Sequence, residues 1–388
     1  MSLLGFLRQG RRDVFEVAVV GSGLPAQVVA LELARRRRRV TVIEPPETEV
    51  GARRPPVGLG LVALGPGRPY EHVVNALGRD RARAVWSAGR ENLGRLRGFL
   101  AEAGRDYGYQ ARGSFLLGAD RREAVSLANS EDMLRDDGFA GEFLDHYMLE
   151  THFDVSGFAG AYWAADDAEL DGAALVATVN AAARAAGVVF RPGSVRGLDA
   201  GRSGAVVETD EGPVRAAFAV VATDSAVSPV LPDLRRSLRP AASPRLQFVP
   251  QAGASLPTAA RTADGRLAWQ RQAAGVTLAA TGEPGTPAGG EPEEGGRLEA
   301  MAARLHATPG SERGWLEATE VSADGLPIVG VVEGRPLAVA CGFGPLAASL
   351  VFAAARWVAD AIQQGRDPTP EPLRVGRKPG GVRGPSPV

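Results

Sequence analysis

The first 45 residues contain two apolar runs separated by a glycine turn and a helical segment. Residues 14–20 are apolar and β-branched and stop at Gly21, and a second run at 40–43 stops at Glu44. Continuous apolar runs of this length are typical of parallel strands buried on both faces. Residues 27–39 between them have a helical composition. The pattern therefore predicts a strand–helix–strand unit at the start of the fold.

Farther along the chain, the apolar positions change between helical and strand periods. From 70 to 103 they recur every three or four residues, and 173–186 is rich in alanine, so both segments are predicted helices. Two apolar runs at 204–210 and 214–222 flank Glu211-Gly212 and predict a hairpin. Further strands, alternating as in an antiparallel sheet, are predicted at 113–118, 160–163, 245–249, 266–272 and 276–280. The fold class is α/β (α+β overall).

Weaker patterns give five more expectations. Residues 142–149 and 298–307 are expected to be helical, and a last helix is expected from 347 to 362. Residues 282–296 consist largely of Gly, Pro and Glu and are expected to form a mobile loop. The end of the chain, 367–388, is expected to be a disordered tail.

The glycine turn reads G-S-G-L-P-A at 21–26. Gly21 permits a tight turn, Gly23 lets a pyrophosphate approach the backbone, and Ala26 stays small where helix and strand meet. Leu24 and Pro25 begin the helix, whose unpaired N–H groups and positive dipole end would face the phosphates. The pattern predicts a dinucleotide site.

Glu44 is the second part of this site. It ends the second strand, where a carboxylate accepts both ribose hydroxyls of an adenosine and repels a 2′-phosphate, so NADP is disfavoured. The pattern alone does not choose between FAD and NAD, although a motif so close to the N-terminus suits FAD.

Composition narrows the function classes. A net charge of −1 gives no field for nucleic acid or an anionic membrane, and no apolar run is long enough for a membrane span. One cysteine, Cys341, excludes an internal disulfide, and the four histidines have no ligand-like spacing, so no metal site is expected. Lysine occurs once, at Lys378, so the folded body offers no tuned amine. We expect a cytoplasmic protein.

Three blocks of sequence resemble the FAD-dependent oxidoreductases of the D-amino acid oxidase type, which include glycine oxidase, sarcosine oxidase and γ-glutamylputrescine oxidase. The first is the glycine turn with V-T-V-I-E at 40–44. The second is G-A-Y-W-A-A-D-D-A-E-L-D at 160–171 with A-V-V-A-T at 219–223. The third is Trp315, S-A-D-G-L-P-I-V-G at 322–330 and L-A-V-A-C-G-F-G at 337–344, a block that NAD dehydrogenases lack.

The resemblance implies a Rossmann-like FAD-binding domain, interrupted by a substrate domain built on an antiparallel sheet, with the flavin at the interface. It assigns 14–107, 170–226 and 318–366 to the FAD-binding domain, and 108–169 and 227–317 to the substrate domain. It also implies that Val195 meets the adenine and that Ala222 and Thr223 line the cofactor. A helix over 348–362 would aim its N-terminus at the flavin, after a turn beside the ring formed by Gly342, Phe343, Gly344, Pro345, Leu346 and Ala347.

The sequence departs from the family pattern where the substrate would bind. Thr319 stands at the place of the family arginine that clamps a substrate carboxylate. Glu317 and Glu320 beside it would favour a cation or an amine if either faces the pocket. The family turn G-x-x-G-H-G has Leu346 in place of its histidine, and the lysine that promotes oxygen reaction in sarcosine-type enzymes has no counterpart here.

Four residues are the candidate active-site positions. Arg53 and Arg54 lie in an irregular segment that, by resemblance, passes over the flavin, so one of them would contact the flavin or an anionic substrate group; a solvated loop arginine is the alternative. Trp269, on a predicted substrate-domain strand, would wall the pocket, and Thr319 marks the altered clamp position.

We expect an FAD-dependent oxidoreductase that oxidises a C–N bond of an amine or N-substituted amino compound by hydride transfer to flavin N5, giving an imine. One alternative is an atypical tailoring enzyme acting on a large or carrier-bound substrate. Another is a partner-dependent flavoprotein subunit with an eroded active site. The expected partner is a small-molecule amine, with no nucleic acid and no stable membrane insertion, while a partner protein or an oligomer stays open.

Overall fold

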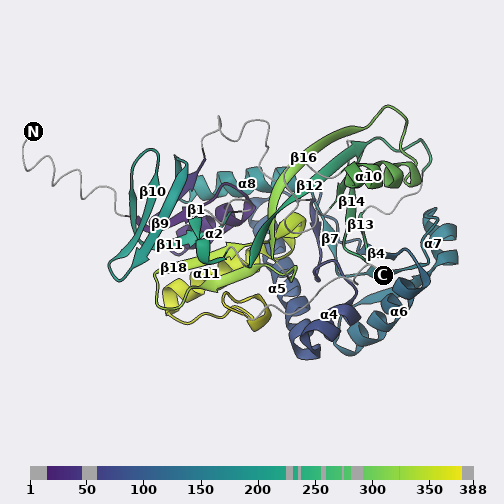
Figure 1. Cartoon of the computed structure of the whole chain (residues 1–388), viewed down its shortest axis with the longest axis horizontal. Helices are drawn as coiled ribbons and strands as arrows, with labels where there is room; N and C mark the ends of the chain where they lie inside the picture. The colour runs from purple at the N-terminus through teal and green to yellow at the C-terminus, as the bar shows by residue number, and fades with distance from the viewer. Residues whose placement is uncertain are drawn as a thin grey trace, which may run out of the picture.

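The computed structural model describes residues 15–45, 59–223, 230–234, 237–254, 259–272, 275–280, 292–322 and 324–377. Arg53 and Arg54 lie outside these ranges, as do most of the expected loop at 282–296 and the last residues of the expected tail. Figure 1 shows a mixed α/β molecule with a sheet in each half, which agrees with the expected fold class.

The first sheet is built on the N-terminal unit. Its eight strands follow the order β17-β18-β11-β1-β2-β8, with β10 and β9 joined to β11. β1 pairs in parallel with β2 and β11 because its apolar side chains are buried on both faces. The strands are β1 (Phe15–Val20), β2 (Val40–Glu44), β8 (Val189–Pro192), β9 (Val195–Gly201), β10 (Gly204–Thr209), β11 (Val214–Val221), β17 (Ile328–Val331) and β18 (Leu337–Cys341).

Helices cover one face of this first sheet. α2 packs against both α8 and α11, and α11 also packs against the long helix α5. The hairpin of β9 and β10 folds over the other face, where it encloses a second apolar cluster with β1, β11 and β18. The helices are α2 (Leu24–Arg35), α5 (Arg79–Ala103), α8 (Gly172–Ala185) and α11 (Val351–Gln364).

The second sheet also has eight strands, in the order β16-β12-β15-β14-β13-β4-β6-β5. All its neighbours pair antiparallel except β13 and β4. The strands are β4 (Ser114–Gly118), β5 (Gly141–Asp145), β6 (Gly160–Ala164), β12 (Leu238–Phe248), β13 (Ala259–Thr262), β14 (Leu267–Gln272), β15 (Gly275–Ala280) and β16 (Arg313–Ser322).

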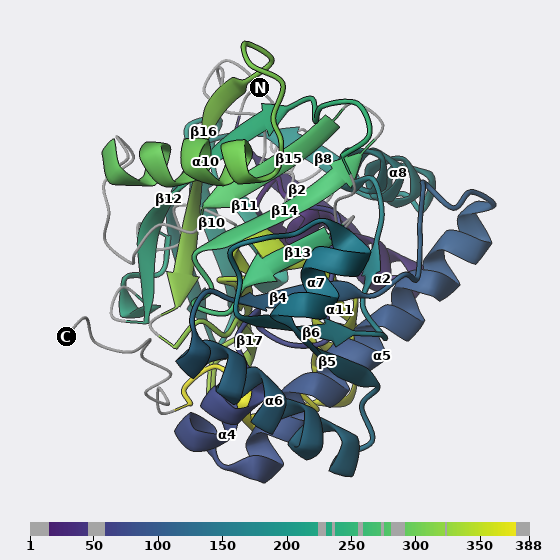
Figure 2. The ribbon, with the colours of Figure 1, turned by 90° about the vertical axis from the view of Figure 1, so that its right-hand side faces the viewer.

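The two faces of the second sheet have different neighbours. The outer face packs under α10 (Pro292–Arg304), which lies across the strands in Figure 2, and beside α7 (His146–Phe153). The inner face meets β3 (Leu61–Val62), which pairs with β7 (Ala168–Glu169), through a small apolar cluster that joins Leu59 and Leu61 to Ala268 and Ala279. α4 (Tyr70–Leu77) and α6 (Arg121–Asp136) complete the described helices.

Several sequence expectations are wrong in detail. The expected helix at 142–149 is strand β5 followed by α7, because β5 gains its hydrogen bonds from β6 and Asp145 caps the helix that follows it. Residues 292–296, expected in the loop, form the first turn of α10. The tail is ordered as far as Arg377, since it forms a short 3₁₀ helix at Glu371–Leu373 and its backbone pairs with Val329.

The domain boundaries themselves stay a prediction. One of them, at 317/318, falls inside β16, which pairs with β12 without interruption from Arg313 to Ser322. β16 therefore runs from the second sheet to the edge of the first, where Val321 bridges to Phe343.

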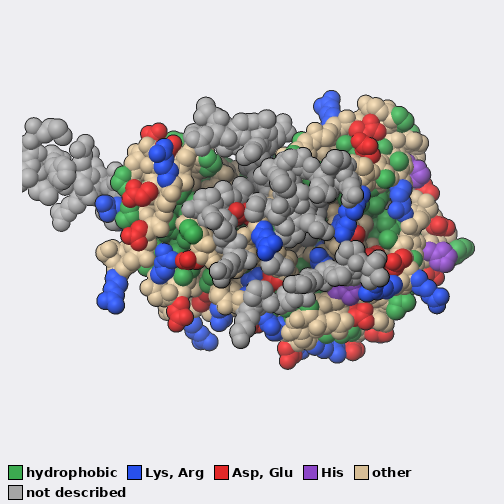
Figure 3. All heavy atoms as spheres, in the orientation of Figure 1, with side chains coloured by type: hydrophobic (Ala, Val, Ile, Leu, Met, Phe, Trp, Pro, Cys, Tyr) green, Lys and Arg blue, Asp and Glu red, His purple; other side chains and the backbone are tan. Residues whose placement is uncertain are grey.

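The described surface carries both signs of charge. Figure 3 shows Arg side chains interspersed with Asp and Glu over the visible face. None of the helices within the described ranges is both long and apolar enough to cross a bilayer.

Candidate functional site

The turn between β1 and α2 leaves no space for a side chain at Gly21. Its φ is +141°, and a Cβ there would lie 2.3 Å from the carbonyl oxygen of Ala222 and 3.2 Å from Cβ of Ala26. The Gly21 N–H donates to Ile43 (3.0 Å), which ties the turn to β2. The positive φ of Gly21 fits the tight turn that the motif predicts, and the small Ala26 fits the predicted close packing of helix and strand.

The backbone N–H groups in the first turn of α2 receive no hydrogen bond acceptor from a capping side chain. Gly23 is its N-cap residue and has no side chain to accept a hydrogen bond from the helix, and Pro25 sits in the first turn. Leu24, Pro25 and Ala26 are buried, so this helix end is held firmly against the sheet. N–H groups that no side chain caps, together with the positive end of the helix dipole, suit a phosphate.

The ends of the neighbouring strands provide the rest of a dinucleotide cradle. Glu44 ends β2 half-buried, its carbonyl accepts a hydrogen bond from Gly193 (2.8 Å), and Val195 begins β9 two residues later. Thr223 follows β11, and its Oγ1 is buried with no hydrogen-bond partner among the described residues. A buried hydroxyl in that state costs about 1–3 kcal/mol, so it fits a site built for a bound polar group. These residues fit an extended FAD.

The C-terminal turn follows the last residue of β18 in the first sheet and lies next to β16. Gly342 and Gly344 have φ of 73° and 59°, and Phe343 bridges to Val321. A 3₁₀ helix, η2 (Gly344–Ser349), follows, and Ala347 in it is buried. The side chains of Pro345 and Leu346 lie outside what the structure describes. The expected helix from 348 is thus wrong at its start, because α11 begins at Val351.

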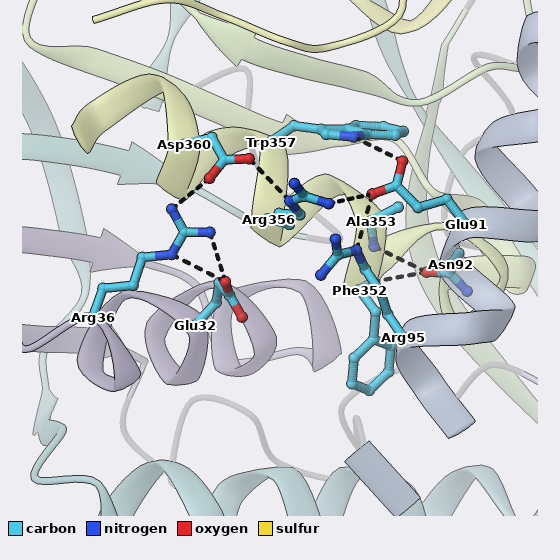
Figure 4. Close-up of polar contacts among 10 residues, drawn as sticks. All are labelled: Glu32, Arg36, Glu91, Asn92, Arg95, Phe352, Ala353, Arg356, Trp357 and Asp360. Carbon is cyan, nitrogen blue, oxygen red and sulfur yellow. Dashed lines mark hydrogen bonds and ion pairs between the residues drawn. The ribbon is translucent and has the colours of Figure 1, made fainter. Parts of the chain in front are cut away.

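Asn92 of α5 anchors this turn, as Figure 4 shows. Its side chain is fully buried; Oδ1 accepts hydrogen bonds from the N–H groups of Phe352 (2.8 Å) and Ala353 (3.2 Å), and Nδ2 donates to the carbonyl of Ala348 (2.8 Å). One side chain therefore caps α11 and holds the end of η2. It also occupies two of the N–H groups that the sequence analysis expected to face the flavin.

An ion-pair network ties the same helices together (Figure 4). Arg36, at the end of α2, donates to Asp360 of α11 (2.6 Å), and Arg356 donates to Asp360 (3.0 Å) and to Glu91 of α5 (3.5 Å). Trp357 donates to the second oxygen of Glu91 (3.3 Å). The glycine turn, which begins α2, and the C-terminal turn, which precedes α11, are thereby fixed to one frame.

The inner face of the second sheet carries buried polar side chains opposite the cofactor domain. Gln270 donates to the carbonyl of Leu170 and accepts from the N–H of Gly60, both at 2.8 Å. Arg261 donates to Asp167 (2.9 Å), which also accepts from the N–H of Leu64 (2.9 Å). Both groups hold the β3 and β7 segments against the sheet.

Burial is the main influence on the pKa values of Asp167 and Arg261. Burial raises the pKa of Asp167, although Arg261 and Ser114 act in the opposite direction, and burial lowers the pKa of Arg261. A cavity of about 30 Å³ lies beside Arg261. It has room for a water molecule and is far smaller than the roughly 300 Å³ of a small substrate pocket, so we assign this cluster to structure.

A second buried ion pair lies on the same face, nearer to β16. Arg245 of β12 donates through Nε (3.1 Å) and Nη2 (2.8 Å) to Glu317 of β16, which also accepts from Trp315 Nε1 (3.2 Å). Both side chains are at least nine-tenths buried. The carboxylate of Glu317 is therefore already paired with a cation, which removes the expected preference of this residue for an amine.

The remaining candidate positions lie on two strands of the second sheet. Thr319 lies opposite Ala241 in β12, and its side chain lies outside what the structure describes. Trp269 is fully buried in the outer cluster with Leu278 and the residues of α10. Its expected place as a pocket wall is wrong, because alternation along β14 points it away from the cofactor domain.

Sequence reasoning missed Arg245 and Asn92. Each leaves a signal: Arg245 is a lone charge in an alternating strand, and Asn92 occupies an apolar-stripe position of its helix, seven residues after Val85 and four before Leu96. A polar residue at a core position predicts a buried partner. Within the described ranges, no group of His, Cys, Asp and Glu could hold a metal ion.

Comparisons with known proteins agree with this arrangement. The FAD dependent oxidoreductase family matches residues 16–361. Glycine oxidase from Geobacillus kaustophilus has a similar structure with a TM-score of 0.74 and 23% identity over 94% of this chain and 99% of that chain. L-proline dehydrogenase from P. horikoshii gives 0.73 and 16% over 92% and 96%, and iminodiacetate oxidase from Chelativorans sp. BNC1 gives 0.69 and 18% over 91% and 97%. No curated protein matches the chain. With a family match over most of its length and a cradle that fits the cofactor, the chain belongs to the FAD-dependent oxidoreductases.

Proposed function

We propose that this enzyme oxidises the C–N bond of an amine or N-substituted amino compound. The observation that carries the proposal is the cradle for FAD, with its tight turn at Gly21 and the buried hydroxyl of Thr223 that no described residue binds, in a chain that the FAD dependent oxidoreductase family matches over residues 16–361. The three similar structures are named after the compounds glycine, L-proline and iminodiacetate. Each of these compounds contains a C–N bond.

When bound, FAD supplies a two-electron acceptor for a hydride equivalent from the carbon next to nitrogen. The chain's residues then have three tasks: to hold the cofactor, to exclude water and to orient the substrate. The cradle of Gly21, Gly23, Glu44 and Thr223 would hold the adenosine and pyrophosphate end. Val195 and Ala222 would line the same path by their backbone, and the turn from Gly342 to Ala347 would lie beside the ring.

The helix frame would keep this turn in place. Because Asn92 already binds the first free N–H groups of α11, the contribution of this helix to a negatively charged flavin would come through its dipole rather than through direct hydrogen bonds. Thr319 would lie at the substrate end of β16, and Arg53 and Arg54 stay candidates for a contact with the flavin or with an anionic substrate group.

Turnover with a panel of primary amines, secondary amines and amino acids tests the proposal. The purified flavoprotein would be assayed in air and, separately, with an artificial dye acceptor, and the carbonyl product of imine hydrolysis would be identified by mass spectrometry. We expect product with at least one amino compound and faster turnover with the dye, because the folded body has no lysine to promote the reaction with oxygen.

Two results would redirect the assignment. Turnover confined to a large or carrier-bound substrate would favour the tailoring enzyme. Activity that appears only when a second protein is added would favour the partner-dependent subunit. Product from no amino compound under either condition, with FAD bound, would contradict the proposal.

A further inference from the structure

Arg245 has one donor group that no residue in the described ranges binds. Its side chain is 2% exposed, and Glu317 takes the Nε and Nη2 groups. Nη1 is buried, and none of the described residues accepts a hydrogen bond from it. The guanidinium is thus oriented by one carboxylate and presents a free N–H₂ group inside the protein.

The strand register places this group on the side of the cofactor domain. Arg245 lies directly opposite Ala279 of β15, and Ala279 belongs to the cluster that meets Leu59 and Leu61. Glu317 lies two residues from Thr319 along β16, toward Val321 and the turn at Phe343. The side chain of Arg245 reaches along the sheet toward Glu317, and so toward that turn.

A buried Nη1 group of Arg245 lowers the stability of the fold unless a ligand accepts a hydrogen bond from it. Burying an arginine and a glutamate removes both charges from water, and a pair of apolar residues in their place is often neutral or stabilising. A buried N–H without a partner adds a further penalty. A buried donor without a partner therefore calls for a ligand, an ordered water or an ion, and the position of Arg245 beside the strand that leads to the turn at Phe343 favours a ligand.

We propose that Nη1 of Arg245 binds an anionic group of the substrate, a carboxylate, and that Glu317 is a positioning residue that orients the guanidinium. The inference rests on the proposed oxidation of amino compounds and narrows it to those that carry a carboxylate. It restores from β12 the anion contact that Thr319 cannot provide from β16. Since the Arg245–Glu317 pair is neutral overall, the site is suited to a zwitterionic amino acid rather than to a dianion.

The first test measures binding without turnover. The holoenzyme would be titrated with acetate and with benzoate, and binding would be followed by calorimetry and by the change in the flavin spectrum. We expect Arg245→Met to weaken carboxylate binding roughly tenfold to a hundredfold, the effect of losing a hydrogen bond to a charged group. Arg239→Gln is the matched control, because it removes an exposed arginine from the same strand and is expected to change nothing.

Glu317→Gln separates a binding role from a structural one. This change removes the competing carboxylate and leaves a buried positive charge, so carboxylate affinity should rise roughly tenfold while the ligand-free protein becomes less stable. A purely structural pair also predicts lower stability for both substitutions, but it predicts no change in carboxylate affinity for either one. If Arg245→Met does not fold, Arg245→Lys and Glu317→Gln decide the question.

Substrate pairs complete the test. Arg245→Met should raise the KM of an amino acid by the same factor and leave the KM of its decarboxylated amine unchanged. Unaltered carboxylate affinity in this variant, or equal use of both substrates by the wild type, would overturn the inference while the proposed oxidation stands. A different result separates the two proposals. If carboxylates bind through Arg245 but the protein oxidises no amino compound, the binding site is supported and the proposed function is contradicted.

Discussion

At the residue scale, the N-terminal turn depends on the absence of one Cβ atom. Gly21 combines a positive φ with a distance of 2.3 Å from an added Cβ to the carbonyl of Ala222. We expect Gly21→Ala to lower the free energy of unfolding by about 1–3 kcal/mol through overpacking alone, with more from the backbone strain. The displaced turn would also lose FAD, so the purified variant should be largely colourless.

The matched control for this prediction is Gly94→Ala. Gly94 lies exposed in α5 with open space around its Cβ position. It should keep its FAD and gain up to about 1 kcal/mol in the free energy of unfolding from helix propensity. Full flavin content in Gly21→Ala would show that the turn does not contact the cofactor as we describe.

Single residues also show where the sequence was informative and where it was not. The strand, tight turn and helix around Gly21 and Ala26 could be predicted because they follow one another locally, and the second strand ends at Glu44 as expected. Trp269 could not, because alternation assigns it to one of two faces and only the pairing of distant strands decides which face meets the cofactor domain. The same limit hid the pair of Arg245 and Glu317, which are 72 residues apart.

At the element scale, α11 depends on a cap supplied by another helix. Asn92→Ala would leave two N–H groups of α11 and the carbonyl of Ala348 without partners, so we expect a loss of about 2–4 kcal/mol in the free energy of unfolding. Asn92→Asp should lose less, since it keeps the acceptor. Chemical denaturation measures the stability, and dialysis measures FAD retention, which should fall with it.

An exposed asparagine provides the control for that comparison. Asn129→Ala removes only a surface hydrogen bond to Glu71 and should change the free energy of unfolding by less than about 0.5 kcal/mol. Equal effects of the two alanine substitutions would contradict the capping role of Asn92.

The segment after α11 is a second element that depends on a distant contact. Arg377 donates to Asp324 at 2.7 and 2.9 Å, and both side chains are buried, so this ion pair closes the C-terminal segment over β17. Arg377→Met should cost about 3–5 kcal/mol, because it leaves Asp324 as an uncompensated buried charge. Thermal unfolding beside the exposed control Arg366→Met measures the difference, and equal melting temperatures would show that the segment contributes nothing.

These element-scale differences have one physical origin. The segment at 142–149 has a helical composition, but the edge of a sheet offered its first residues hydrogen bonds that local propensity cannot foresee. The last helix begins three residues later than expected because Asn92 holds its start. The tail looked disordered because its Pro- and Gly-rich composition does not show the buried partner of Arg377.

At the scale of the whole molecule, the two eight-stranded sheets have different roles. The first carries the cradle for FAD, and the second has an inner face with buried ion pairs beside a small apolar cluster and an apolar outer face that packs against α10. The network of α2, α5 and α11 holds the two cofactor-side turns in one frame (Figure 4). The family and the cofactor could be predicted from three blocks of sequence, whereas the substrate side depends on contacts that only the folded chain brings together.

An anaerobic titration of the purified protein with amino compounds tests the central claim most directly. The protein should be yellow, and its visible flavin band should bleach when a suitable amino acid is added without oxygen, because electrons then pass from the C–N bond to bound FAD. Recovery of the band on admitting air would report the rate of the oxygen reaction. A flavin band that no amino compound bleaches would contradict the proposed chemistry, and a protein that cannot be loaded with FAD would contradict the account of the cradle itself.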